Sequence, residues 1–277
     1  MEIWHRVGLN AIKDIKFKNA IEKIGIEYQT LPLPGHDIGL LYFDISESDS
    51  NWPHISDLIK IYKASDVCDT IHDVEEILSA SWCRLIPEIE QGSISPQQHH
   101  LAWKKQVYKD VCGECGAYGN QIKPFTINKN LRPGKNAFLS LTGTYTILGT
   151  NKVFEVLIEN SIQGLESWEL TLDQSDKPIQ NMKQIYIPHE SESKIISGNW
   201  KSKICPNCGI RKFLPHRRGY LEFENQLLNS RFDILRTREW FGDGKAAYQE
   251  ILVSSKFSRQ IVKNRWKGVR LKPVILD

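Results

Sequence analysis

Long apolar runs are missing from the 277-residue sequence. The longest, around residues 38–43, falls far short of the roughly 20 apolar residues that a membrane-spanning helix needs. The first ten residues, MEIWHRVGLN, include charged side chains where a signal peptide requires an apolar segment. We therefore expect a cytoplasmic protein with no membrane partner.

The sequence also lacks a strong excess of charge of one sign. Its 36 basic and 33 acidic residues give a net charge of +3, which is too small to imply a nucleic-acid or acidic-lipid partner. Hydrophobic residues make up 40%, an ordinary share for a globular protein. A chain of this length can bury a core without metal or disulfide support, so any metal would organise one region.

Common catalytic motifs are absent: we find no P-loop, GxGxxG, HExxH or GxSxG pattern. His99 and His100 are adjacent, and neighbouring side chains on a helix point apart, so we expect both to be exposed. The segment Asp233–Glu239 is expected to form surface ion pairs. The sequence therefore predicts no catalytic residue.

Six cysteines are present, and four of them form two CxxCG turns, Cys112–Gly116 and Cys205–Gly209. In a reducing cytosol this pattern indicates metal or redox chemistry before disulfides. Two CxxC turns supply four thiolates, the complete ligand set of a structural zinc ion. We predict one structural Zn²⁺ bound by Cys112, Cys115, Cys205 and Cys208. Cys68 and Cys83 are expected to be small buried residues.

Two other readings of the cysteines remain. Either CxxC pair alone could be a redox dithiol. A catalytic zinc usually has three protein ligands and one open position, whereas four cysteines leave none, so the pattern argues weakly against metal-assisted hydrolysis.

The first hundred residues are predicted to be mixed α/β. We expect a buried strand at residues 39–45, a helix over residues 69–87 ended by Pro87, a linker at 91–98 and a short helix at 100–108. Farther along, we expect an extended stretch at 137–148 and surface loops at 173–184 and 189–198. These patterns predict an N-terminal α/β region, residues 1–105, and a zinc-binding region, residues 106–277.

The zinc-binding region contains an internal repeat. A shift of 104 residues places Ile147–Leu165 on Ile251–Val269 without a gap, with five identical positions that include Asn160/Asn264 and Gly164/Gly268. Each copy follows its own CxxCG turn and reads as a strand, a Thr or Ser cap, a helix, a glycine and a second strand. We predict an α/β or α+β fold in which two related halves, about 111–172 and 204–277, join at the four-cysteine zinc site. Convergence on a common strand–helix–strand pattern is the alternative.

A basic cluster follows the second CxxC turn. Its members are Arg211, Lys212, His216, Arg217 and Arg218. A zinc ribbon carrying these residues could contact phosphate. Nearby Glu222 and Glu224 dilute the charge, so we favour a solvated loop and keep nucleic-acid contact by Arg211, Lys212, Arg217 and Arg218 as an alternative.

Together, the two CxxCG turns and the C-terminal segments Phe232–Arg238, Ile251–Phe257 and Gly268–Val274 resemble the double-CXXCG motif family. The resemblance covers roughly residues 111–274. The chain departs from the family pattern in its longer N-terminal region and in Leu271, where an aromatic residue is common.

Members of that family are bacterial immunity proteins encoded beside polymorphic or contact-dependent toxins. The resemblance therefore implies a cytoplasmic antitoxin that binds and neutralises a cognate toxin by occlusion, without catalysis. The shared motifs concern the scaffold, so no toxin-binding residue follows from them, and neither does an oligomeric state. The alternatives are a nucleic-acid-binding zinc ribbon and an enzyme that reverses a toxin's modification.

Overall fold

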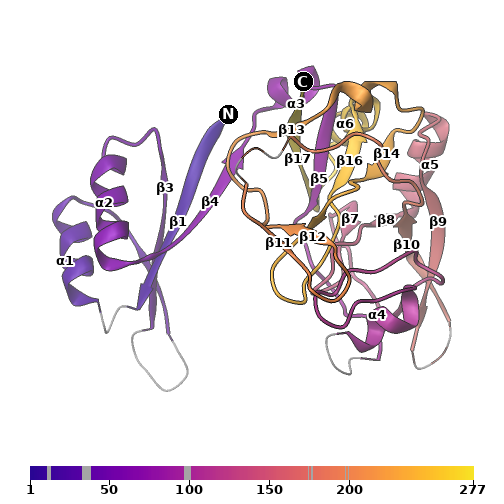
Figure 1. Cartoon of the computed structure of the whole chain (residues 1–277), viewed down its shortest axis with the longest axis horizontal. Helices are drawn as coiled ribbons and strands as arrows, with labels where there is room; N and C mark the ends of the chain where they lie inside the picture. Colours follow the sequence, from indigo (N-terminus) through magenta and orange to yellow (C-terminus); the bar gives the residue numbers. More distant parts are fainter. Residues whose placement is uncertain are drawn as a thin grey trace. The chain divides into compact units, whose positions relative to one another are not determined.

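The chain folds into two compact units (Figure 1). The computed structural model describes residues 1–10, 14–32, 39–96, 101–173, 175, 177–196, 198 and 200–277. The first unit comprises Met1–Asp73 and Arg217–Gly219, and the second comprises Val74–His216 and Tyr220–Asp277.

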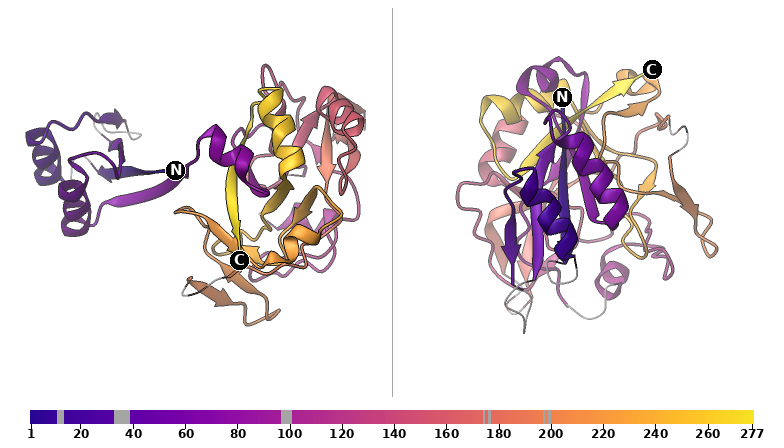
Figure 2. Two further views of the ribbon diagram at one scale, coloured as in Figure 1. Left: turned by 90° about the horizontal axis from the view of Figure 1, so that it is seen from above. Right: turned by 90° about the vertical axis from the view of Figure 1, so that its left-hand side faces the viewer.

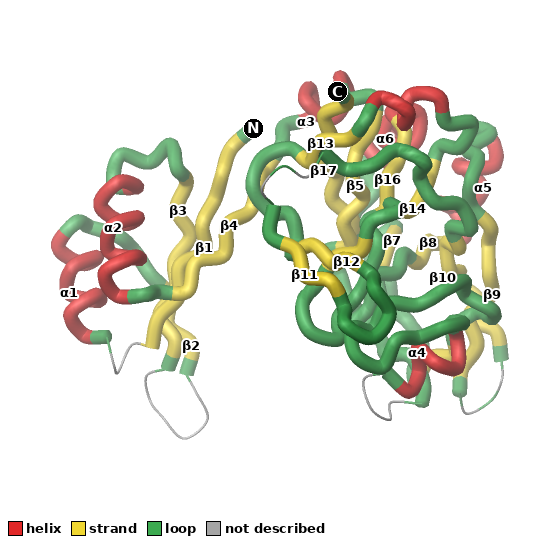
Figure 3. The backbone as a smooth tube through the Cα atoms, viewed as in Figure 1, coloured by secondary structure: helices red, strands yellow, loops and turns green. Residues whose placement is uncertain are grey.

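The first unit is a four-stranded antiparallel sheet with two helices on one face (Figure 3). The chain order is β1 (Glu2–Asn10), α1 (Ile15–Lys23), β2 (Gln29–Leu31), β3 (Leu40–Ser46), α2 (Trp52–Tyr62) and β4 (Ser65–Ile71). The strand order β2-β3-β1-β4 with this βαββαβ connectivity is that of ferredoxin-like domains. Alternate residues of β1 and β3, such as Val7 and Phe43, pack against Phe17 and Ile55 of the helices.

A short segment from far along the chain completes the first unit. The Thr70 hydroxyl donates to the Arg217 carbonyl at 2.9 Å and accepts from the Gly219 N–H at 2.8 Å. Between these two bonds, the Arg218 guanidinium pairs with Glu47.

The second unit contains two five-stranded sheets and one three-stranded sheet. Its helices are α3 (Val74–Ser79), α4 (Ala102–Val107), α5 (Asn151–Glu159), the 3-10 helix η1 (Asn225–Asn229) and α6 (Ser255–Lys263). The first large sheet has the order β6 (Thr126–Ile127), β9 (Glu166–Leu172), β10 (Pro178–Tyr186), β8 (Leu148–Thr150) and β7 (Phe138–Leu139). The second has the order β13 (Leu221–Phe223), β17 (Val269–Leu276), β5 (Trp82–Pro87), β16 (Ile251–Ser254) and β14 (Ile234–Arg236). The small sheet has the order β11 (Ser202–Ile204), β12 (Arg211–Phe213) and β15 (Trp240–Phe241).

The two large sheets have the same design. In each, one outer strand runs parallel to its neighbour, and the three other pairings are antiparallel. The registers also correspond. Gln184 of β10 pairs with Leu148. Arg84 of β5 pairs with Leu252, which is Leu148 shifted by 104 residues.

The helices that follow β8 and β16 end in the same way. Asn160 and Asn264 each donate a side-chain N–H to the carbonyl four residues earlier, at 2.8 and 2.9 Å. The next residues, Ser161 and Arg265, adopt positive φ angles of 51° and 52°. The helices lie side by side (Figure 2), and Gln260 of α6 donates to Asn160, the residue that follows α5, at 3.2 Å. The two segments related by the sequence repeat therefore have the same local structure, a strand, a helix ended by Asn and a second strand.

The halves also exchange a strand, which the sequence did not indicate. We take the first repeat as β5 to β9 and the second as β10 to β17. Strand β5, the first of its repeat, then lies at the centre of the sheet formed by the second repeat. Strand β10 likewise lies at the centre of the sheet formed by the first repeat. A shared core between the sheets holds residues from both repeats, including Leu85, Phe138, Ile185 and Ile234. The two repeats therefore depend on each other for their cores.

This exchange corrects three predictions. The boundary near residue 105 lies instead at residue 73, because β5 belongs to the second unit. The helix over residues 69–87 is wrong: this segment contains the end of β4, α3 and β5. The loop over residues 173–184 is also wrong, because β10 begins at Pro178. A register irregularity between Pro178 and Lys183 interrupts the alternation that would have revealed this strand.

Other predictions are confirmed. The expected strand at 39–45 is β3, and the strand–cap–helix–glycine–strand pattern at the C-terminus is β16, α6 and β17. The Ser254 hydroxyl caps α6 by accepting from the Phe257 N–H at 3.3 Å.

The extended stretch predicted at 137–148 is strand only at Phe138–Leu139 and at Leu148, the first residue of β8. None of the helices in the described part of the chain is long and apolar enough to span a membrane.

Candidate metal centre

Each CxxCG segment forms the same tight turn. The Gly116 N–H donates to the Cys112 carbonyl, and the Gly209 N–H donates to the Cys205 carbonyl, both at 2.9 Å. Both glycines have positive φ angles, 75° and 73°, which glycine adopts without steric cost. A Cβ atom on Gly116 would also lie 2.0 Å from the Lys245 carbonyl oxygen. The glycine after the first turn is therefore required by both backbone conformation and space.

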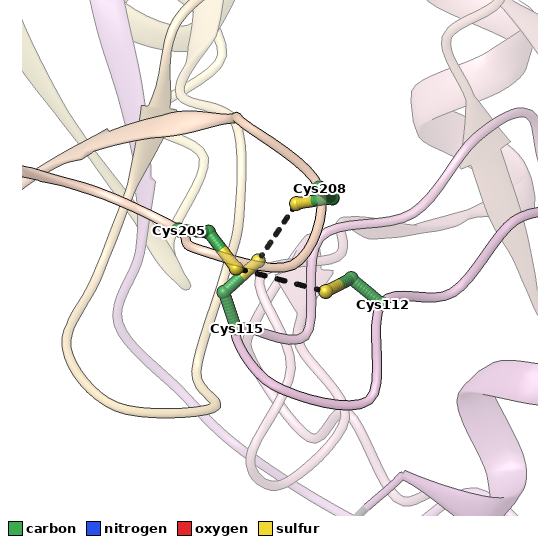
Figure 4. Close-up of side chains that lie close together, drawn as sticks. All are labelled: Cys112, Cys115, Cys205 and Cys208. Carbon is green, nitrogen blue, oxygen red and sulfur yellow. Dashed lines mark hydrogen bonds between the residues drawn. The ribbon is translucent and has the colours of Figure 1, made fainter.

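The two turns bring their four sulfur atoms together (Figure 4). All four lie within 4.8 Å of one another. The sulfurs of Cys112 and Cys205 are 3.8 Å apart, and those of Cys115 and Cys208 are 3.6 Å apart. Each of these distances joins corresponding cysteines of the two repeats, so the cluster follows the same repeat relationship as the sheets.

The spacing of the sulfurs fits a four-coordinate metal ion. With metal–sulfur bonds of about 2.3 Å, the sulfurs of a tetrahedral site lie about 3.8 Å apart. The two measured separations are close to this value, and both are far longer than the roughly 2.0 Å of a disulfide. Four cysteines in this arrangement could hold one metal ion, and all four positions of a tetrahedron would then be filled.

The environments of the four thiols differ. Cys112, Cys115 and Cys205 are buried, whereas Cys208 is exposed. The Asn207 side chain donates to the Cys112 sulfur at 3.4 Å and, with the Cys115 backbone N–H, lowers the pKa of Cys112 to about 6. Burial raises the pKa of Cys115 to about 12. The pKa values of the two thiols in the first turn are therefore shifted in opposite directions.

Two buried lysines lie beside the turns. Lys104 of α4 donates to the carbonyls of Gly116 and Ala247 at 3.0 and 3.1 Å. Lys212 of β12 donates to the carbonyls of Cys115 and Gly244 at 3.1 and 2.5 Å. A divalent ion with four thiolates carries a net charge of about −2, so two ammonium groups would balance it. Burial, followed by the charge of Lys212, lowers the pKa of Lys104 to about 8 in the absence of metal.

The structure divides the basic cluster between the two units. Lys212 is buried beside the four cysteines, and Arg211 donates to the Ser202 hydroxyl at 3.1 Å. Arg217 and Arg218 belong to the first unit, where Arg218 pairs with Glu47. The four side chains are thus divided between two units, and one of them is withdrawn from solvent.

The other predicted residues have separate positions. Cys83 is fully buried, as predicted, and burial raises the pKa of its thiol to about 11. Cys68 is only partly buried. His99 and His100 lie outside the described residues.

Sequence reasoning missed Lys104 and Asn207. Lys104 lies eight positions before the first CxxC turn and resembles any surface lysine of a short helix. Asn207 lies within the second turn, where a side-chain donor to sulfur was a possible signal.

Comparison with known proteins does not identify a family. No protein-family model matches the chain, and no curated protein shows significant similarity to it.

Proposed function

We propose that the protein is an immunity protein that binds a cognate bacterial toxin in the cytosol and neutralises it by occlusion, without catalysis. The observation that carries this proposal is the four-cysteine cluster formed by two CxxCG turns of two related repeats. Those turns and the C-terminal β14–β16–α6–β17 segment are the features that resemble the double-CXXCG immunity proteins.

The metal in this proposal is Zn²⁺, held by Cys112, Cys115, Cys205 and Cys208. Zinc favours tetrahedral thiolate coordination, and a site with four protein ligands is typical of a structural role. Bound there, it supplies a crosslink between two segments that are distant in the sequence, and it leaves no position for a substrate. Such a crosslink supports a rigid binding scaffold, which keeps the free and bound conformations of an inhibitor similar.

The test is co-expression with the toxin domain encoded beside this protein. We expect rescue of growth, a stoichiometric complex on size-exclusion chromatography and about one zinc per chain in the same peak. A toxin that is equally lethal with and without the protein contradicts the proposal.

Titration of toxin activity separates occlusion from enzymatic reversal. Occlusion predicts full inhibition at about one protein per toxin, because each inhibited toxin holds one inhibitor. An enzyme that reverses the toxin's modification would restore the modified target at much lower ratios, and that outcome would replace the occlusion mechanism.

A further inference from the structure

The sheet of the first unit has one covered face and one open face. Helices α1 and α2 both lie on the covered face (Figures 1 and 3), where Val7, Leu41 and Phe43 belong to the core. Side chains of a strand alternate between its two faces, so the residues between these core positions project from the other side. Within the described residues of the first unit, no helix lies on that side. We call it the open face, and its main members are Trp4, Gly8, Leu40, Tyr42, Val67 and Ile71.

The open face carries exposed apolar side chains from three strands. Val67 and Ile71 of β4 are 41% and 46% exposed, and Leu31 of β2 and Leu40 of β3 are 50% and 42% exposed. Leu31 pairs with Leu40, so these two side chains lie side by side. Apolar groups gathered on one face of a small unit are typical of an interaction surface, whereas single exposed ones are ordinary.

Gly8 lies near the centre of this face. It pairs with Tyr42 of β3 and with Ser65 of β4, and it does not have a positive φ angle. A Cβ atom added to it would meet, beyond its chain neighbours, only the Leu41 carbonyl oxygen, at an ordinary 3.8 Å. Neither the backbone nor the packing of this unit therefore requires glycine there, although glycine weakens a strand. A glycine inside a strand often marks a place where another molecule approaches the backbone closely.

The polar side chains beside Gly8 already have partners on the same sheet. The Tyr42 hydroxyl donates to Gln29 of β2. Arg6 donates two hydrogen bonds to Asp44, at 2.7 and 2.6 Å, and its guanidinium carbon lies 5.7 Å from the centre of the Tyr42 ring. Side chains that are ordered before binding lose little conformational entropy when a partner docks.

The open face is acidic. The strand register places the carboxylates Glu2, Asp44 and Asp69 on it, together with a single cation, Arg6. The described lysines of the first unit lie elsewhere, on α1 and α2 or directly after α2. As a whole, the first unit has twelve acidic and nine basic residues, whereas the second has 21 acidic and 27 basic residues. The small positive charge of the chain therefore conceals an acidic unit, and charge complementarity favours a basic partner.

We propose that the open face of the first unit is the docking surface for a protein partner with a basic surface. Apolar groups of the partner pack against Val67 and Ile71, a segment of the partner lies over Gly8, and its basic side chains approach Glu2 and Asp44. The inference rests on the proposed function for the identity of the partner, which is then the toxin.

The variant Gly8→Val separates a role in binding from a role in folding. Valine favours strands, so we expect the urea midpoint of the first unit, measured on the full-length zinc-loaded protein, to equal or exceed that of wild type. The added side chain fills the gap in the open face. We therefore expect the dissociation constant of the toxin complex, measured by isothermal titration calorimetry, to rise at least about tenfold. A lower urea midpoint would show that the fold itself requires Gly8 and would overturn its place in binding.

The variant Ile71→Ala tests the open face by truncation, without adding a side chain. We expect it to weaken the toxin complex at least about tenfold, with an unchanged circular dichroism spectrum. The control is Ile61→Ala, the same change on α2 at a side chain that is 69% exposed, which should alter the affinity less than about twofold. Equal affinities of the two variants overturn docking on the open face.

Reversal of one charge tests the chemistry of the partner. Glu2→Lys on the open face should slow association with the toxin at least about fivefold at low ionic strength. Asp57→Lys makes the same charge change on α2, at a side chain that is 71% exposed, and should slow association less than about twofold. Equal association rates of the two variants overturn the basic partner surface.

The outcomes distinguish the docking surface from the immunity function. Weaker toxin binding by Gly8→Val and Ile71→Ala, but not by Ile61→Ala, supports docking on the open face. If all three variants bind like wild type and still rescue growth, docking there is overturned and the immunity function stands. If the wild-type protein neither binds the toxin nor rescues growth, the immunity function fails, and the toxin as occupant of this face fails with it. A wild-type dimer that Gly8→Val converts to a monomer assigns the face to a second copy of the chain and overturns the toxin as its occupant.

Discussion

Gly164 and Gly268 occupy the same place in the two repeats, and each lies against a backbone carbonyl of the opposite repeat. A Cβ atom on Gly164 would lie 2.5 Å from the Ile234 carbonyl oxygen, and one on Gly268 would lie 1.9 Å from that of Phe138. Phe138 and Ile234 are themselves equivalent, because each lies on an edge strand of its sheet. Phe138 pairs with Gly149 of β8, and Ile234 pairs with Val253 of β16, which is Gly149 shifted by 104 residues. Each helix-ending turn is therefore closed by the edge strand of the other repeat.

Substituting either glycine by alanine should destabilise the second unit. Both residues have φ angles near 100°, and in each case the nearest atom is a backbone carbonyl oxygen that cannot rotate away. We expect a loss of at least about 3 kcal/mol in the free energy of unfolding for Gly268→Ala, and a smaller loss for Gly164→Ala. Urea unfolding of the zinc-loaded protein measures both. Gly134→Ala is the control, because Gly134 also has positive φ but no atom lies near its Cβ position, and its cost should be about 1 kcal/mol.

The same repeat shows how far sequence reasoning could reach. The glycine, the cap and the helix of each copy are local signals, and the pattern at residues 251–276 was predicted correctly. Strand β5 was not predicted. Trp82 and Leu85 continue the helical spacing of the apolar residues before them, and the strands β16 and β17 that pair with β5 lie far along the sequence.

The cysteine cluster was predictable for a different reason. The CxxC spacing places two sulfurs on one tight turn, and two such turns indicate a shared site. The buried lysines beside it depend on tertiary contacts. A lysine buried beside the cysteine cluster has the same local sequence as one in solvent, so neither Lys104 nor Lys212 could be assigned this position beforehand.

Removal of one cysteine should remove the metal. Cys205→Ser replaces a thiolate by a hydroxyl that binds zinc poorly, so we expect zinc content, measured by mass spectrometry, to fall well below about one equivalent per chain. Stability of the second unit should fall with it, because metal binding and folding are coupled. Cys68→Ser changes a thiol outside the cluster and should retain the zinc. A full equivalent of zinc in Cys205→Ser would falsify the four-cysteine site.

Lys104→Met should weaken zinc binding without removing a ligand. The substitution keeps the apolar stem but deletes the ammonium group that bonds to Gly116 and Ala247. Loss of an outer-shell partner commonly lowers metal affinity by about 10–100-fold, which competition with a zinc chelator measures. Lys105→Met alters the exposed neighbour and should change the affinity less than about twofold. Equal affinities of the two variants contradict a compensating role for Lys104.

The buried ion pair between Arg84 and Glu250 joins the exchanged strand β5 to the second repeat. Their side chains are 4% and 1% exposed, their closest atoms are 2.5 Å apart, and Tyr145 donates to the other oxygen of Glu250 at 2.6 Å. Glu250→Gln leaves a buried guanidinium without its counterion, and we expect it to lower the free energy of unfolding by about 3–5 kcal/mol.

A more exposed pair on the same unit provides the comparison. Lys183 and Glu169 are 31% and 53% exposed, so Glu169→Gln should cost less than about 1 kcal/mol. Urea unfolding measures both variants under the same conditions. If Glu250→Gln costs no more than Glu169→Gln, the Arg84–Glu250 pair does not hold β5 in its sheet.

His216 should make the stability of the second unit depend on pH. Burial, followed by the charges of Arg84 and Lys272, lowers the pKa of His216 from 6.5 to about 4. As the pH falls below 6.5, the unfolded state takes up a proton that the folded state does not, so stability decreases between pH 6.5 and 4 and the full loss is present below pH 4. Because His216 is partly exposed, we expect a contribution of about 1–2 kcal/mol after allowance for solvent screening.

The variant His216→Gln should remove this pH dependence of the free energy of unfolding, measured in urea between about pH 7 and 5. The variant His54→Gln, at an exposed histidine, should keep it. Wild-type protein and His216→Gln share every other titrating group, including the zinc ligands. If the free energy of unfolding has the same pH dependence in both proteins, His216 does not take up a proton on unfolding.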